Sequence, residues 1–170
     1  MKRLLAGALA LALAACGGDT APVAKGRPGT KVQPADLVAT VRAAGVAGDE
    51  LDVQPLRDPQ VDDLRAQAEA LEARGKYKPA LAALNQALAI TPGDPELLQR
   101  KAELALQVRA WPDAERFASA SYDAGPRLGG LCRRNWTTVQ LARERRGDAP
   151  GAALARKQVD SCTVAPPVRM

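Results

Sequence analysis

A repeat of constant period runs through the second half of this chain and constrains its fold more than any other feature. Residues of similar type or size recur at one constant separation along the sequence. Ala68 recurs as Ala102, Ala80 as Ala114, Pro92 as Pro126, and Tyr77 as Trp111. One unit of this length cannot bury its apolar face alone, so neighbouring units must stack. The period therefore predicts stacked repeats from Val61 to about Cys162.

Composition favours helices as the repeated elements. Aromatic residues make up only 3% of the 170 residues, while alanine and leucine dominate the second half of the chain. Small side chains suit closely packed helices, whereas a β-sandwich needs bulky, β-branched strands. A chain of this length has room for one ordinary domain with appended segments. We therefore expect an all-α protein with one core.

The clearest copy of the repeat runs from Leu71 to Pro95. Its marker residues are Gly75 and Tyr77 at a turn, Ala80 and Ala87 in a second helix, and Pro92 at the end. A glycine at the turn supplies the left-handed conformation that ends a helix, and alanines let helices approach closely. This pattern resembles the tetratricopeptide repeat, and the resemblance implies stacked antiparallel helical hairpins.

A third unit departs from the period. Trp136, Val139, Gly147 and Ala152 fit its positions, but the step from Ala114 to Ala152 is longer than the period by four positions. Four extra residues make about one helical turn, so the first helix of this unit or the connection before it must be longer. We expect a short solenoid of about three tetratricopeptide-like hairpins over residues 61–163. A generic set of alanine-rich antiparallel helices is the alternative.

Residues 1–15 have the pattern of an export signal. Lys2 and Arg3 precede an apolar run that is too short for a transmembrane helix, which needs about 20 residues. The run ends in Leu-Ala-Ala-Cys, which resembles the lipobox of bacterial lipoprotein precursors. The resemblance implies removal of residues 1–15 and lipidation of Cys16, whose acyl chains together anchor a protein stably. An ordinary secretory signal with an incidental cysteine is the alternative.

The residues after Cys16 indicate where the anchor lies. Within the lipoprotein family that the lipobox resembles, an aspartate directly after the lipidated cysteine is associated, in many enteric-type bacteria, with retention in the inner membrane, whereas here that residue is Gly17. We therefore expect an outer-membrane anchor facing the periplasm. Residues 16–34 are typical of a disordered tether because they are rich in glycine, proline and small polar residues. Residues 35–60 are poorly defined, with a possible short helix around Leu37, Val38 and Val41, and residues 164–170 form a tail.

Two further cysteines, Cys132 and Cys162, indicate one disulfide, because an even number in an oxidising compartment is typical of paired cysteines. They lie at similar distances on either side of the expected hairpin turn at Asp148, so two antiparallel helices place them side by side. Such a bond would stabilise the fold by roughly 3 kcal/mol. We expect it to clamp the last hairpin in place of the capping helix that repeat arrays usually carry.

Nothing in the sequence points to catalysis. The chain has no histidine that could activate a nucleophile, and its serines are limited to Ser119, Ser121 and Ser161. It also contains no glycine-rich phosphate loop and no paired-carboxylate motif. The absence of histidine and the wide spacing of the cysteines also argue against a zinc site. We expect no enzyme, no cofactor and no metal, and an enzyme acting on the cell wall is the least favoured possibility.

Binding is the expected activity, because stacked helical hairpins form a concave surface that commonly receives extended or helical peptides. The resemblance places groove-lining positions on Arg65, Glu69, Glu72, Gln99, Glu103, Gln107, Thr137, Glu144 and Arg145. This groove would run from acidic to basic. We expect an adaptor that binds a protein or peptide partner in the periplasm at the outer membrane.

The basic C-terminal part of the chain suggests a rival function. A basic patch is expected at Arg133, Arg134, Arg143, Arg145 and Arg146. Such a patch suits an anionic envelope polymer, and the protein would then be a structural or regulatory tether. Nucleic acid is not an expected partner, because no aromatic residues interleave with these arginines to stack on bases.

Overall fold

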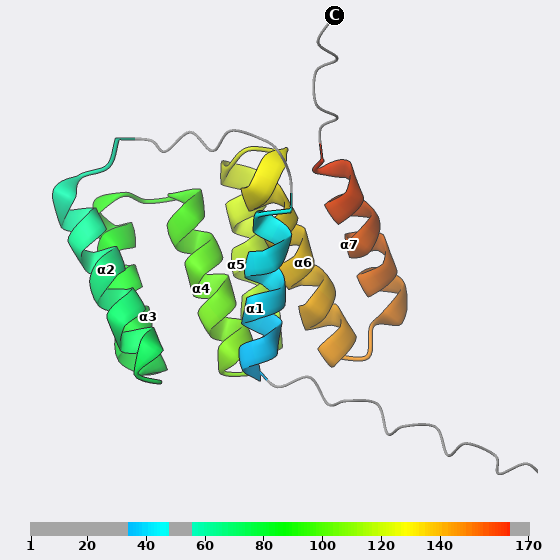
Figure 1. Ribbon diagram of the computed structural model, residues 1–170, viewed down its shortest axis with the longest axis horizontal. Helices are drawn as coiled ribbons and strands as arrows, with labels where there is room; N and C mark the ends of the chain where they lie inside the picture. The colour runs from blue at the N-terminus through cyan, green and yellow to red at the C-terminus, as the bar shows by residue number, and fades with distance from the viewer. Residues whose placement is uncertain (1–33, 48–55, 164–170) are drawn as a thin grey trace, which may run out of the picture. The chain divides into compact units, whose positions relative to one another are not determined.

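The computed structural model describes residues 34–47 and 56–163, which lie within one unit of the chain, Val32–Met170. The expected signal peptide, the lipidation at Cys16, the tether up to residue 33 and the tail from residue 164 lie outside the described residues. The described part consists of seven α-helices and contains no strand (Figure 1). The all-α expectation is confirmed. None of these helices has the length and apolar character needed to cross a membrane.

Six of the helices form three consecutive antiparallel hairpins, which confirms the expected solenoid. Their bounds are α2 Pro59–Ala73 and α3 Tyr77–Ile90, α4 Pro95–Gln107 and α5 Trp111–Ala124, and α6 Gly129–Arg145 and α7 Ala149–Ser161. The first helix of the third hairpin has 17 residues, whereas that of the second has 13. The four extra residues of the third unit therefore lengthen the helix itself by about one turn.

Aspartate caps and left-handed turn residues define the hairpins locally. Asp58, Asp94 and Asp148 precede α2, α4 and α7, and each carboxylate accepts a hydrogen bond from a backbone N–H of the first turn. Positive φ angles end the first helix of each hairpin, at 70° for Gly75, 63° for Arg109 and 80° for Gly147. The middle hairpin thus makes the same turn as the others with an arginine where they have glycine.

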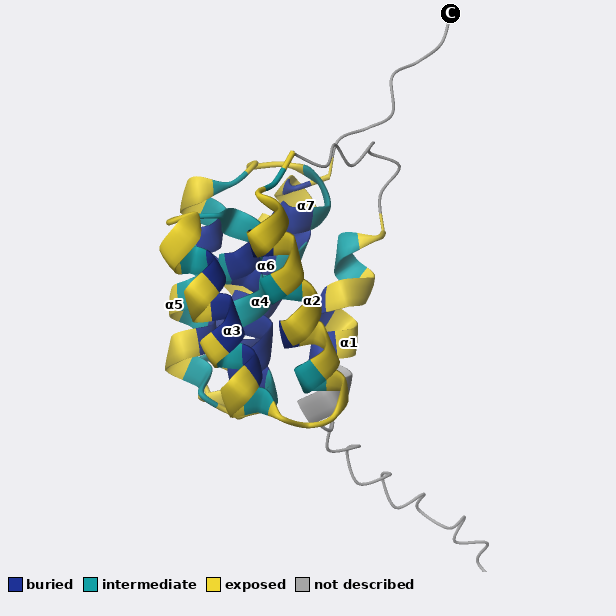
Figure 2. Ribbon diagram, turned by 90° about the vertical axis from the view of Figure 1, so that its left-hand side faces the viewer, coloured by how far each residue is buried: buried dark blue, intermediate teal, exposed yellow. Residues whose placement is uncertain are grey.

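Small residues allow the hairpins to stack. Ala102, Ala118, Val139 and Ala155 come from α4, α5, α6 and α7 and form one buried cluster with Phe117 and Trp136 packed against it. Figure 2 shows the buried faces turned inward and the exposed residues on the outer surface of the stack. Cys132 and Cys162 are both buried and are joined by a disulfide, with their Cα atoms 5.6 Å apart, as the sequence led us to expect. The bond ties the start of α6 to the end of α7.

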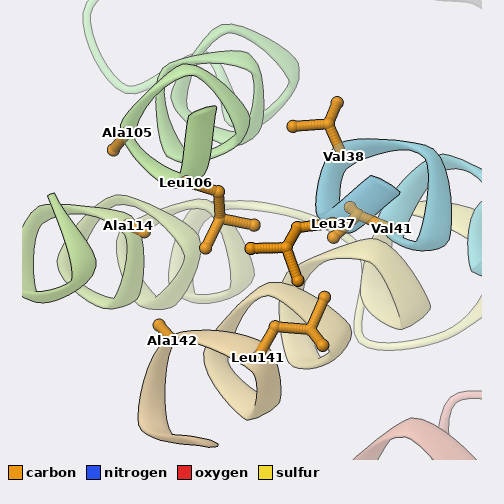
Figure 3. Packing of buried hydrophobic residues seen from close by; sticks show 8 residues of the cluster. All are labelled: Leu37, Val38, Val41, Ala105, Leu106, Ala114, Leu141 and Ala142. Atoms are coloured by element: carbon orange, nitrogen blue, oxygen red, sulfur yellow. The ribbon is translucent and has the colours of Figure 1, made fainter. Parts of the chain in front are cut away.

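A seventh helix, α1, spans Pro34–Gly45, in the segment where the sequence allowed a short helix. Leu37, Val38 and Val41 are buried, and all three face the hairpin stack. They pack against Leu106 of α4 and Leu141 of α6, among other residues (Figure 3). An element outside the repeat therefore contributes to the core of the repeat domain.

Candidate partner-binding groove

The helices that begin each hairpin, α2, α4 and α6, provide the positions that line the groove in a tetratricopeptide array. In this structure α1 lies along α4 and α6 and runs antiparallel to them (Figure 1). Leu37, near the start of α1, meets Leu141 near the end of α6. The end of α1 instead meets Arg133, near the start of α6. The chain thus places one of its own helices on the surface where the sequence predicts a partner.

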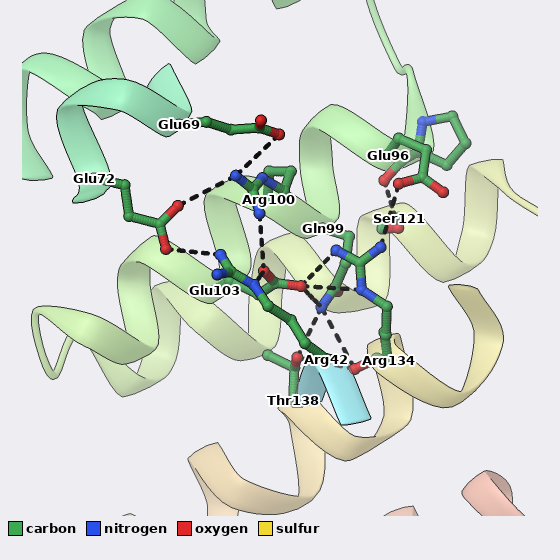
Figure 4. A network of polar contacts seen from close by, with 11 residues as sticks. Arg42, Glu69, Glu72, Glu96, Gln99, Arg100, Glu103, Ser121, Arg134 and Thr138 are labelled. Carbon is green, nitrogen blue, oxygen red and sulfur yellow. Dashed lines mark hydrogen bonds and ion pairs between the residues drawn. The ribbon is translucent and has the colours of Figure 1, made fainter. Parts of the chain in front are cut away.

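The centre of this surface is a buried carboxylate surrounded by arginines. Glu103 of α4 has only 1% of its side chain exposed. Its carboxylate accepts hydrogen bonds from Nε of Arg42 at 2.9 Å and from Nε of Arg134 at 3.0 Å, and Arg100 lies 3.6 Å away (Figure 4). Three arginines from α1, α4 and α6 therefore converge on one acid, so this acid links all three helices.

The charges decide the protonation state of Glu103. Burial by itself would raise the pKa of its carboxyl group, but the charges and hydrogen bonds of the arginines outweigh burial. Arg134 contributes most, followed by Arg42 and Arg100, and together they lower the pKa of Glu103 below its ordinary value of 4.5. Glu103 is therefore an anion at neutral pH and a fixed acceptor for the three guanidinium groups.

A second carboxylate extends the same network towards α2. Glu72 accepts a hydrogen bond from Arg42 at 2.7 Å and another from Arg100 at 3.2 Å (Figure 4). Gln99 completes the link between α4 and α6, since its amide donates to the hydroxyl of Thr138 at 2.9 Å. Arg42 of α1 thus bridges Glu72 and Glu103, which belong to two different hairpins.

The C-terminal end of α1 has its own binding site on α6. The buried Arg133 donates from Nε to the carbonyl of Ala44 at 2.9 Å and from Nη2 to the carbonyl of Gly45 at 3.2 Å. A cation at this end of a helix satisfies free carbonyls and is favoured by the helix dipole. A Cβ atom added to Gly130 would lie 2.5 Å from the carbonyl oxygen of Gly45. Glycine at position 130 therefore permits the close approach of α1.

The structure divides the predicted groove residues into three groups by exposure and corrects part of the expectation. Gln99, Glu103 and Thr137 are buried rather than open to a partner. At Glu103 the physical reason is that Arg42, Arg100 and Arg134 surround the carboxylate. Glu72 and Gln107 are half-buried and bonded within the domain, Gln107 to the hydroxyl of Tyr77. Four residues stay accessible, fully or in part, and these are Arg65, Glu69, Glu144 and Arg145.

Four of the five arginines of the predicted basic patch make contacts within the domain. Arg133 binds the end of α1, and Arg134 binds Glu103. Arg143 and Arg146 both pair with Glu115, at 2.8 and 2.7 Å. Arg145 alone among the five predicted residues, all of which the structure describes, is exposed without such a contact. Glu115 is one carboxylate shared by two arginines, so its charge balances only one of them.

The sequence reasoning missed Arg42 and Arg100. Arg42 directly follows Val41 in a short helix outside the repeat, and nothing in the local pattern indicates an acidic partner 61 residues away.

Within residues 34–47 and 56–163, no group of three or more His, Cys, Asp or Glu side chains is placed to hold a metal ion. The contacts that this surface makes with α1 are apolar packing, ion pairs and the hydrogen bonds from Arg133 to the last carbonyls of α1.

Comparisons with known proteins agree with this geometry. The family model described as tetratricopeptide repeat matches residues 61–104. Among solved structures, the chain is similar to the globular C-terminal domain of P. aeruginosa LpoP, with 30% sequence identity and a TM-score of 0.59. The match covers 62% of this chain and 99% of that chain. No curated protein matches the chain.

Proposed function

Because this chain belongs to the bacterial lipoproteins that contain tetratricopeptide repeats, we propose that it is a lipid-anchored adaptor that holds a protein partner at the outer membrane. Its signal would be removed before Cys16, and residues 16–34 would connect the anchor to the folded domain in the periplasm. Tetratricopeptide arrays act as binding scaffolds rather than as enzymes. The adaptor function needs no cofactor and no metal.

One observation carries this proposal. The surface formed by α2, α4 and α6, called the inner face of the hairpin stack from here on, accommodates an amphipathic helix, α1, through apolar burial and ion pairs. These are the two interactions by which a helical segment of another protein is recognised in a groove. A surface that binds one helix in this way has the shape and the chemistry for a protein partner.

The accessible members of the predicted groove are the residues through which a partner would first be contacted. Arg65 and Glu69 lie on α2, and Glu144 and Arg145 lie at the end of α6. Glu69 has 53% of its side chain exposed and pairs with Arg100 at 3.2 Å. Exposed charges of this kind contribute to the rate and specificity of association more than to affinity.

Crosslinking in intact cells tests the adaptor function. We compare the wild type with a variant carrying Arg65→Ala and Glu69→Ala, and identify crosslinked proteins by mass spectrometry. The matched control carries Arg156→Ala and Asp160→Ala, which remove one basic and one acidic exposed residue from α7. Loss of a protein in the first variant and its retention in the control would support recognition by the inner face.

Two results would argue against the proposal. A partner list that is the same in both variants would contradict recognition through the inner face. The absence of any crosslinked protein, combined with steep loss of cell-wall polymer binding as salt rises, would favour the charge tether instead, because charge-dominated binding to a polyanion weakens with salt.

A further inference from the structure

The helix α1 contacts the hairpin stack as a bound helical peptide would. Leu37, Val38 and Val41 turn one face to α4 and α6, whereas Ala39 and Ala43 on the other face are exposed. Apolar residues spaced one and four positions apart are the usual anchors of a helix that lies in a groove. The contact is therefore one-sided, with an apolar strip flanked by the charged Arg42.

The hairpins are connected to one another without α1. The three helix pairs α2–α3, α4–α5 and α6–α7 pack within each hairpin, and α3 on α4, α5 on α6 and α4 on α6 join the hairpins. The disulfide between Cys132 and Cys162 adds a covalent link inside the third hairpin. By contrast, α1 packs chiefly on two helices, α4 and α6, and adds the bridge from Arg42 to Glu72 of α2. The helix α1 therefore packs onto a stack whose hairpins already contact one another without it.

Removal of α1 would uncover a site of defined chemistry. Its apolar floor is formed by Ala105, Leu106, Leu141 and Ala142. Acceptors for a basic side chain stand beside the floor at Glu72 and Glu103, and Arg133 is placed to bind the last carbonyls of a helix. Such a site selects an amphipathic helix that carries a basic residue next to its apolar strip.

We propose that α1 is a releasable occupant of the inner face, and that a basic amphipathic helix of the protein partner takes its place. This inference rests on the proposed adaptor function, because it states how the same surface is regulated. The covalent connection between α1 and α2 keeps α1 at a high local concentration, on the order of millimolar for a short linker. A partner helix must therefore compete with α1, so weak or unrelated helices are rejected.

A peptide-binding experiment tests the release of α1. The probe is a fluorescent peptide with the sequence of residues 34–47, and the protein is the full-length lipoprotein in detergent. Val41→Asp places a charge in the buried strip and releases α1, whereas the control Ala39→Asp makes the same change on the exposed face. We expect Val41→Asp to bind the probe at least tenfold more tightly than wild type, and Ala39→Asp to behave as wild type.

A second probe tests the chemistry of the site. A peptide in which the residue equivalent to Arg42 is glutamate should bind the Val41→Asp protein at least tenfold more weakly, because Glu72 and Glu103 then face an acid. Equal binding of the two probes would overturn the assigned partner class. Hydrogen exchange provides a readout independent of the probes, since a releasable α1 should exchange its amides faster than α4 and α6.

The remaining outcomes are also decisive. If Val41→Asp abolishes the helical signal of the hairpins, α1 is an integral part of the core and the inference is wrong. If the hairpins remain folded but do not bind the probe, the inner face is not a helix site and the inference is equally wrong. Partner capture that is unchanged by Val41→Asp would overturn the control by α1 and leave the adaptor function standing. If the peptide binds but no cellular partner is captured, the adaptor function would be overturned and the control of the inner face by α1 would stand.

Discussion

The guanidinium group of Arg42 and the carboxylate of Glu103 are 2.9 Å apart although 61 residues separate them in the chain. This ion pair joins the helix outside the repeat to the middle hairpin. Because Glu103 is buried and also binds Arg134, the pair connects α1, α4 and α6 at one point. The stability of the domain should therefore be sensitive to the charge at position 103.

Glu103→Gln should destabilise the domain strongly. The substitution removes the buried carboxylate that Arg134 and Arg100 share, and leaves Arg134 only Glu96 and Arg100 only the carboxylates of α2 as acidic partners. Removal of one partner from a buried ion pair costs about 3–5 kcal/mol. Urea unfolding measures the loss. The control Glu69→Gln removes a half-exposed partner of Arg100 and should cost less than about 1 kcal/mol. Equal losses in the two variants would contradict the central role of Glu103.

Acid should destabilise the wild type through the same group. The pKa of Glu103 is lowered in the folded state, so its charge stabilises the fold above the ordinary value of 4.5. This contribution is lost as pH falls below 4.5 and through the folded-state pKa, because the arginines then face a neutral acid. Thermal unfolding between pH 7 and pH 3 should show a steeper decline for the wild type than for Glu103→Gln. Parallel curves would assign the acid sensitivity to other carboxylates.

Arg109→Gly should stabilise the domain by about 1 kcal/mol. Arg109 has a φ of 63°, in the left-handed region where a side chain costs roughly 1–2 kcal/mol and glycine costs little. Gly75 and Gly147 occupy the same place in the other hairpins. The reciprocal variant Gly75→Arg should lose stability by a similar amount. Thermal unfolding of both variants measures the effect, and a shift in the same direction for both would refute the explanation from backbone conformation.

Loss of the disulfide should destabilise the third hairpin. The bond closes a loop between residues 30 positions apart, and the chain-entropy model assigns such a loop about 3–4 kcal/mol. The double variant Cys132→Ala and Cys162→Ala should therefore unfold at a lower urea concentration than the oxidised wild type. A reducing agent should lower the midpoint of the wild type and leave that of the double variant unchanged. A midpoint that does not respond to reduction would show that the bond adds nothing.

Cys16→Ser should release the protein from the membrane. The proposed anchor needs the thiol, because serine does not accept the lipid in its place. Fractionation of cells should find the wild type with the outer membrane and the variant in the soluble fraction or as an uncleaved precursor. Recovery of the wild type in the soluble fraction would contradict lipid anchoring, and recovery with the inner membrane would correct the expected sorting.

The local pattern of the sequence was enough to predict the hairpins. The constant period, the small residues at Ala80 and Ala114, and the four extra residues of the third unit all correspond to features of the structure. The cysteine pair followed from the same reasoning, because antiparallel arms of similar length bring Cys132 and Cys162 together. Helix periodicity and turn chemistry act over a few residues, so the amino-acid sequence determines them directly.

The tertiary structure alone decided which of the predicted groove residues are accessible. Helical spacing in Leu37, Val38 and Val41 indicated an apolar face but not the surface that it covers. That choice depends on contacts between distant segments, such as Arg42 with Glu103 and Arg133 with Ala44, for which no repeat or spacing provides a signal. Burial depends on what packs over a residue, and Glu103 lies at the centre of a closed network because Arg42, Arg100 and Arg134 come from three different helices to its carboxylate.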